Sequence, residues 1–272
     1  MKNLKRFFLI ILILSPVLFA QGTAGSGAKL ESQYLIDMPT AGVLKKGNVG
    51  TSFYLMPEGV FIAQLDVGVF DNFSFGISYG ASNFIGVGTP SWYKLPGVNI
   101  KVKVLEETET MPAISIGFDS QGKGQFFTNY SDFNKSDTNT ADFEINRFKI
   151  KSPGFFIAGS KNFQFLGYLS LHGCVNYSLE RDDMDKDLNL RIGAEKTLGS
   201  KLSIIAEYDF AVNDNIQTSM GDGTGYLNAG IRWSIGEGFT IGFDLRDLLS
   251  NKKLNTGAAD RAVKVEFIKP IF

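Results

Sequence analysis

The sequence predicts an all-β chain that forms a transmembrane antiparallel up-and-down β-barrel of about 12 strands. Three observations support this fold class: apolar and polar residues alternate with period two, the connections alternate between short and long, and 24 Phe and 30 Gly accompany only 8 Pro. Aromatic residues favour strands, and glycine favours the tight turns between them. A helical period of 3.6 residues is found nowhere at comparable length.

The N-terminus has the pattern of a secretory signal peptide. Basic residues precede an apolar run at 7–14, and Ala20-Gln21-Gly22 offers a cleavage site between small residues. The run is shorter than the roughly 18 residues that a membrane helix needs. We therefore predict a signal peptide at 1–22, a periplasmic N-terminal extension at 23–46 and an outer-membrane barrel at 47–272.

The period-two alternation is clearest at 73–80, where Phe73, Phe75, Ile77 and Tyr79 alternate with serine and glycine. Similar alternation recurs along the chain, and such segments are half-buried strands. The predicted strands lie near 48–56, 60–70, 73–82, 97–106, 111–119, 153–161, 163–178, 187–196, 201–211, 224–235, 238–247 and 261–269.

Every second connection between the predicted strands is a short turn, and one of these turns is predicted at Lys161-Asn162. The connections that alternate with them are longer polar segments, apart from the first hairpin at 57–58. Short turns at one end and long loops at the other are typical of outer-membrane barrels. The longest loop, 120–152, is expected to be irregular, with 143–151 extending the sixth strand above the membrane.

A membrane-spanning β structure must close on itself, because the bilayer offers no partner to a free backbone N–H or C=O. The apolar face of each strand then contacts lipid, and the polar face lines a lumen. The polar faces carry charges of both signs, which predicts ion pairs across the barrel and a narrow or closed interior. The predicted lumen charge network comprises Asp66, Lys101, Lys103, Arg191, Glu195, Glu207, Asp209, Arg232, Asp244 and Arg246.

The residue pattern indicates no catalytic, cofactor or metal site. The chain has one cysteine, Cys174, which excludes an intramolecular disulfide and a CxxC pair, and one histidine, His172. His172 lies in the lumen phase of its strand and is expected to form hydrogen bonds there. The match of residues 76–80 to G-x-S-x-G lies inside a strand, without the helix that a nucleophile elbow needs.

Four carboxylates lie close together in the segment 181–187. Oxygen-rich loops can bind Ca²⁺, but this one lacks the glycine and terminal glutamate of an EF-hand. A solvated outer loop is the expected reading. The formal net charge of −1 gives no basic field for nucleic acid, so no nucleic-acid partner is expected.

Several short segments carry a family resemblance. Residues Leu35 to Gly42 before the first strand, and Pro96-Gly97-Val98 leading toward Pro112-Ala113, resemble the YjbH-type outer-membrane barrels that accompany exopolysaccharide gene clusters. Ser160-Lys161-Asn162 and Glu207-Tyr208-Asp209 fit the same resemblance. The resemblance extends over roughly residues 35–210. It implies a barrel architecture and a link to extracellular polysaccharide.

The favoured function is that of a non-catalytic outer-membrane barrel, a narrow or closed channel or an assembly component, linked to polysaccharide export. Expected partners are outer-membrane lipid, the barrel insertion machinery and polysaccharide, in the outer membrane of a Gram-negative-type bacterium. One alternative is an outer-membrane hydrolase, a phospholipase or a protease. Another is a secreted soluble β-sandwich or adhesin, whose polar strand faces would contact water.

Overall fold

The computed structural model describes residues 22–133, 142–253 and 259–271, so the predicted signal peptide lies outside the described residues except for Gly22. One short helix, α2 (Tyr130–Phe133), accompanies the strands in this part of the chain. The strands are β1 (Asn48–Met56), β2 (Val60–Phe70), β3 (Phe73–Ser82), β4 (Ser91–Trp92), β5 (Gly97–Leu105), β6 (Ala113–Asp119), β7 (Lys123–Asn129), β8 (Glu144–Ile150), β9 (Gly154–Gln164), β10 (Tyr168–Tyr177), β11 (Asn189–Leu198), β12 (Leu202–Asp209), β13 (Tyr226–Gly236), β14 (Phe239–Arg246) and β15 (Asp260–Pro270).

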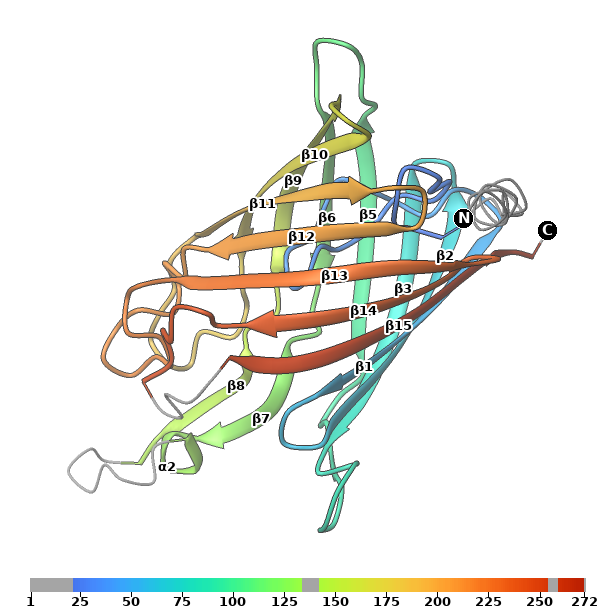
Figure 1. Ribbon diagram of the computed structural model, residues 1–272. Helices are drawn as coiled ribbons and strands as arrows, with labels where there is room; N and C mark the ends of the chain where they lie inside the picture. The colour runs from blue at the N-terminus through green and yellow to red at the C-terminus, as the bar shows by residue number, and fades with distance from the viewer. Residues whose placement is uncertain (1–21, 134–141, 254–258, 272) are drawn as a thin grey trace, which may run out of the picture.

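A single antiparallel sheet closes into a barrel (Figure 1). The sheet has 13 strands, of which β4 is a two-residue strand beside β3. The other twelve form the wall, and the pairings of β1 with β15 and of β2 with both β1 and β3 complete the ring. Closure pairs the strand edges that an open sheet would expose. The predicted fold class and strand number are confirmed, and the soluble β-sandwich alternative is wrong.

Alternate side chains of each strand point away from the lumen, and most of these outward side chains are apolar. The exposed side chains on the wall include Phe75, Ile77, Ile100, Ile116, Ile157, Leu171, Val175, Leu190, Ile192, Ile204, Ile231, Trp233, Phe243 and Leu245. Such a band suits the hydrocarbon of a bilayer, where hydrated polar groups would be unstable. No helix of the described residues is long and apolar enough to cross a membrane.

The connections divide between the two ends of the barrel as predicted. The short-turn end carries the β2–β3, β5–β6, β9–β10, β11–β12 and β13–β14 turns. The long-loop end carries the short β1–β2 hairpin and the five longer connections, of which the one between β6 and β9 contains β7, α2 and β8.

Two local predictions are wrong. The β9–β10 turn lies at Phe165–Gly167 and not at Lys161-Asn162, because β9 keeps pairing with β10 as far as Gln164. Leu166 and Gly167 adopt positive φ values of 45° and 98°, which make this turn. The segment 143–151 does not extend the sixth strand of the wall, because β8 pairs with β7 in a separate two-stranded sheet.

Replacing Ile231, an exposed residue midway along β13, with arginine would place a charge in the apolar band. We expect Ile231→Arg to lower the free energy of unfolding by about 2–4 kcal/mol. Urea titration of the protein folded into lipid vesicles measures this loss. Ile231→Leu is the control, and equal stability of the two variants would contradict the lipid-facing assignment.

Candidate functional site

The N-terminal segment fills the barrel lumen. We call residues 22–46 the plug (Figure 1, blue). The backbone N–H groups of Ser26 and Gly27 donate to the carbonyls of Gly199 and Ser200 at the short-turn end. The chain then turns tightly at Leu35–Met38 and returns to the same end, where the Gly47 N–H donates to the Gly68 carbonyl.

Every residue from Gln33 to Leu44 is buried. The sequence predicted a periplasmic N-terminal extension at 23–46, and the structure places residues 33–44 within the ring of strands (Figure 1). The lumen offers these residues many buried hydrogen-bonding partners.

One carboxylate binds the tip of the plug, which is the turn at Leu35–Met38. Glu207 on β12 accepts the backbone N–H groups of Ile36 at 3.0 Å, Asp37 at 2.9 Å and Met38 at 2.9 Å. Asn228 donates to its other oxygen at 3.1 Å. Successive N–H groups that converge in this way form a nest for an anion. The nest satisfies a carboxylate that is only 1% exposed.

Asp37, at the tip, forms ion pairs with two cations. Arg246 on β14 donates through Nε at 2.8 Å and through Nη2 at 3.1 Å, and Lys123 on β7 donates through Nζ at 2.9 Å. The two-pronged arginine contact fixes both the position and the orientation of the carboxylate. Two further arginines bind tip carbonyls, Arg191 that of Asp37 at 3.0 Å and Arg232 that of Leu35 at 2.8 Å.

Apolar packing completes the seat of the tip. Leu35, Ile36 and Met38 form a buried cluster with Phe156, Ala158, Cys174 and Ile205 of the wall. Gly193 makes room for it, because a Cβ there would lie 2.5 Å from Leu35 Cδ1. Cys174 is thus a small buried residue of this contact.

Two lysines of β5 hold the base of the plug. The Lys101 ammonium donates to the carbonyls of Gln33 at 2.8 Å and Gly42 at 3.1 Å. The Lys103 ammonium binds both carboxylate oxygens of Glu31, at 2.9 and 2.6 Å. The lumen cations are therefore satisfied largely by the plug.

The remaining members of the predicted lumen charge network lie along the wall. Asp209 pairs with Arg191 at 2.9 Å, and Asp244 with Arg232 at 2.5 Å, each pair on adjacent strands. Asp66 accepts hydrogen bonds from Gln64 and Asn99. Glu195 lines a cavity near the short-turn end. The sequence predicted ion pairs across the barrel and a narrow or closed interior. The observed pairs join neighbouring strands or join the wall to the plug.

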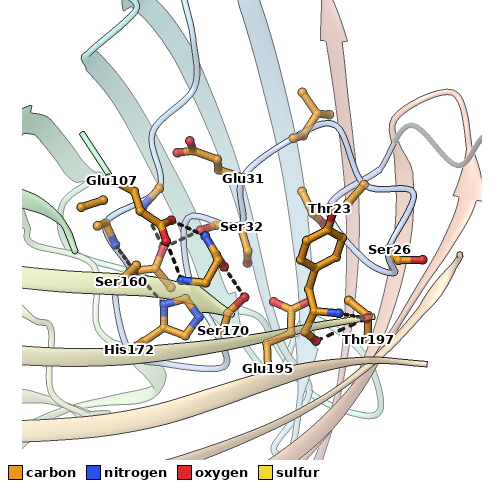
Figure 2. A pocket seen from close by; sticks show the side chains of 18 of the residues that line it. Thr23, Ser26, Glu31, Ser32, Glu107, Ser160, Ser170, His172, Glu195 and Thr197 are labelled. Atoms are coloured by element: carbon orange, nitrogen blue, oxygen red, sulfur yellow. Dashed lines mark hydrogen bonds between the residues drawn. The ribbon is translucent and has the colours of Figure 1, made fainter. Parts of the chain in front are cut away.

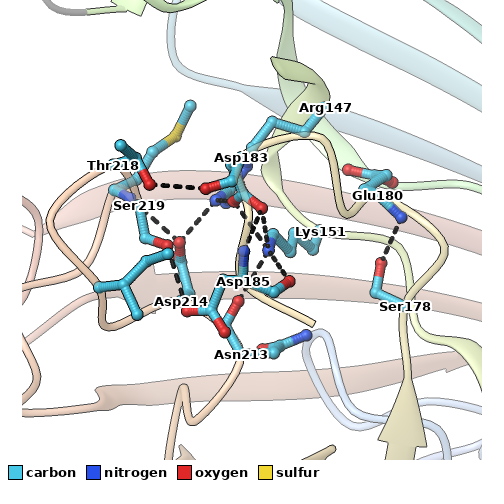
Figure 3. Close-up of polar contacts among 12 residues, drawn as sticks. Arg147, Lys151, Ser178, Glu180, Asp183, Asp185, Asn213, Asp214, Thr218 and Ser219 are labelled. Atoms are coloured by element: carbon cyan, nitrogen blue, oxygen red, sulfur yellow. Dashed lines mark hydrogen bonds and ion pairs between the residues drawn. The ribbon is translucent and has the colours of Figure 1, made fainter. Parts of the chain in front are cut away.

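A second polar cluster lies at the long-loop end (Figure 3). Arg147 on β8 bridges Asp183 at 2.7 Å and Asp214 at 2.6 Å, and Lys151 contacts Asp183 at 2.8 Å. We call β7, β8 and the two loops that carry these aspartates the cap. Asp183 and Asp185 are buried, so the predicted solvated loop at 181–187 is wrong at these positions.

Charge pairing decides the protonation of the cap cluster. Burial alone would raise the pKa of Asp214, but Arg147 overcomes this effect and lowers it. Burial would likewise lower the pKa of the Arg147 guanidinium, but Asp214 and Asp183 raise it. Both partners are therefore charged at neutral pH.

A polar cavity of about 360 Å³ remains between the plug and the wall near the short-turn end (Figure 2). His172 lines it, as its predicted lumen phase requires, and His172 Nδ1 is 2.8 Å from Ser160 Oγ. Ser160 also accepts the Ala41 N–H at 2.9 Å.

The serine of the G-x-S-x-G string is not placed beside the histidine. Ser78 on β3 donates to Gln121 at 3.0 Å, and β5, β6 and β9 separate β3 from β10, which carries His172. Within the described ranges, no group of three or more His, Cys, Asp or Glu residues is arranged to hold a metal ion.

Part of the chain matches a known protein family. Residues 31–146 match the family model described as exopolysaccharide biosynthesis protein YbjH. The chain is similar to the YjbH exopolysaccharide family. The resemblance predicted from Leu35 to Gly42 and from Pro96 to Ala113 is confirmed, although the matched range ends before the predicted limit near residue 210. None of the curated proteins compared with the chain matches it.

The fold also resembles those of solved outer-membrane proteins. The KdgM porin is 9% identical, with 81% of this chain and 98% of that chain covered and a TM-score of 0.47. The Acinetobacter baumannii outer membrane protein Omp33 is 10% identical, with 81% and 96% covered and a TM-score of 0.44. The NanC porin is 10% identical, with 83% and 99% covered and a TM-score of 0.41.

Glu207→Gln removes the charge that three tip amides share. We expect faster amide hydrogen exchange at residues 36–38, reflecting a local loss of about 1–3 kcal/mol because a neutral acceptor binds the nest more weakly. Hydrogen exchange followed by mass spectrometry measures it. Glu237→Gln, in the exposed β13–β14 turn, is the matched control. Unchanged exchange at the tip would show that Glu207 does not hold the plug.

We expect the cap to stay folded in mild acid. Asp214 has a lowered pKa in the folded state, so the stability that it contributes is present above its ordinary pKa of about 3.9 and is lost as pH falls through the folded value. We expect β8 amides to stay protected from pH 7 down to about 4 and to lose protection below that. Hydrogen exchange across this range tests it, with Asp214→Asn as the variant that loses protection already at pH 7.

Proposed function

We propose that the protein is an outer-membrane barrel whose passage is closed at rest by its own N-terminal plug, and that it serves the export of an extracellular polysaccharide without catalysing a reaction. The short-turn end faces the periplasm in this proposal, as short turns do in barrels of this class. The observation that carries the proposal is the plug, which occupies the lumen through Glu207, Arg246 and Lys101.

The character of these contacts supports a removable plug. Most of them are hydrogen bonds and ion pairs from wall charges, and water can replace a protein partner of this kind when a lumen opens. The wall behind the plug carries charged residues that contact it on β5, β11, β12, β13 and β14, as befits an aqueous passage. The family match supports the polysaccharide as cargo.

Conductance in planar bilayers tests the closed passage. We expect the full chain to pass little or only intermittent current. Deletion of residues 23–45 should give large, steady steps, because the wall charges are then hydrated. Gly193→Leu should also raise the current, since its side chain would occupy the seat of Leu35.

Glu237→Gln is the control and should behave like the full chain. Steady, large currents through the unaltered protein would refute the closed state. A plug deletion that folds, shown by heat-dependent migration on gels, and yet passes no current would refute the passage.

A further inference from the structure

The cavity beside the plug has the size and position of a ligand site. Its volume of about 360 Å³ falls within the range of about 300–1,000 Å³ that ligand pockets occupy. One side is formed by the plug, through residues such as Glu31 and Thr40, and the other by β5, β9, β10 and β11. It lies near the short-turn end, at Thr197 beside the β11–β12 turn.

The cavity lining is rich in groups that bind hydroxyls. Ser160, Ser170, Thr197 and Asn162 face it together with four glutamates, and Lys103 is the only cation among the lining residues that the structure describes. Lys103 is already bound to Glu31. A cavity of this composition favours a neutral or cationic polar ligand and disfavours an anion.

Two hydrogen-bonded chains order these groups (Figure 2). In the first, Ser170 donates to the Asn162 side chain, which in turn donates to Glu107 at 2.6 Å. In the second, Ser160 joins His172 to the Ala41 N–H of the plug. Within the described residues, His172 Nε2 is buried and has no hydrogen-bond partner. An unsatisfied buried ring nitrogen is costly, so a small rotation of the ring toward the cavity would let a ligand hydroxyl satisfy it.

Tyr168 adds an aromatic surface to the polar groups. It lines the cavity and is 45% exposed, and its backbone N–H donates to Thr197 Oγ1 at 2.8 Å. An exposed ring offers an apolar face beside hydroxyl-binding groups. A sugar matches both features of the cavity, since a pyranose ring has an apolar C–H face and a rim of hydroxyls.

We infer that this cavity binds one or two residues of a neutral or amino-substituted glycan, with Tyr168 against the sugar face and His172, Ser170 and Glu195 at its polar groups. This inference rests on the proposed function and specifies the chemical class of its cargo. Because Glu31, Thr40 and Ala41 of the plug form part of the site, a glycan that enters from the short-turn end meets the plug directly.

Direct binding to the full chain in detergent tests the site. The probes are the glucosamine trimer, cellotriose and trigalacturonate, compared by titration calorimetry and saturation-transfer NMR at pH 7. We expect the glucosamine trimer and cellotriose to bind and trigalacturonate to bind at least about tenfold more weakly, a difference of about 1.4 kcal/mol. Tighter binding of trigalacturonate, or no binding of the other two, would overturn the inference.

Variants locate the binding. We expect Tyr168→Ala and His172→Asn each to weaken binding of the glucosamine trimer about tenfold. The matched controls are Tyr208→Ala, whose ring packs on Phe210, and Ser74→Ala, which removes a buried hydroxyl without a hydrogen-bond partner among the described residues. Heat-dependent gel migration shows that each variant is folded.

Equal binding by the cavity variants and the controls would place the glycan elsewhere and refute the site. The assay needs no current, so its failure is separable from that of the proposed function. If the plug-deleted barrel conducts and the full chain binds no probe, the glycan site alone is refuted.

Discussion

The structure depends on one constraint: a β-sheet that crosses a bilayer must close, and closure encloses the polar faces of its strands. In this chain that enclosed surface carries buried charges such as Glu207, Arg246 and Lys101. Breaking a buried ion pair costs about 3–5 kcal/mol, because the remaining charge has no partner. The interior must therefore be filled either by water or by protein groups that supply partners.

The plug supplies those partners through its backbone as much as through its side chains. Glu207 accepts three consecutive N–H groups, and Arg191, Arg232 and Lys101 donate to carbonyl oxygens of the plug. A tight turn without regular secondary structure leaves these backbone groups free to bind the wall, whereas a helix would use them internally and a strand would pair them with its neighbours. The irregular conformation of residues 33–44 thus follows from the charges that surround it.

The strands of the wall could be predicted from the sequence because the patterns that specify them lie within short segments of the chain. Alternation along segments such as 73–80 fixes which face contacts lipid, and turn residues fix the ends. The plug and the cap could not be predicted, since their contacts join distant residues: Asp37 and Arg246 are 209 positions apart. A signal did exist in Gly193 on the lumen face and in the cations Arg147 and Lys151, which pair with Asp183 in the acidic run at 181–187.

The arrangement also limits how the lumen can open. A ligand shifts an equilibrium only by its difference in affinity for the two states, and reversing a 1:99 population takes about 5.5 kcal/mol. One sugar in the cavity beside Tyr168 replaces few of the contacts that hold the plug, because the grip on Asp37 and the Glu207 nest lies deeper. In the proposed function, a polymer would replace them in succession, hydroxyl by hydroxyl, as it advances from the short-turn end. On that proposal, the polar lumen favours closure by the plug without cargo and passage when a long polyhydroxylated chain is present.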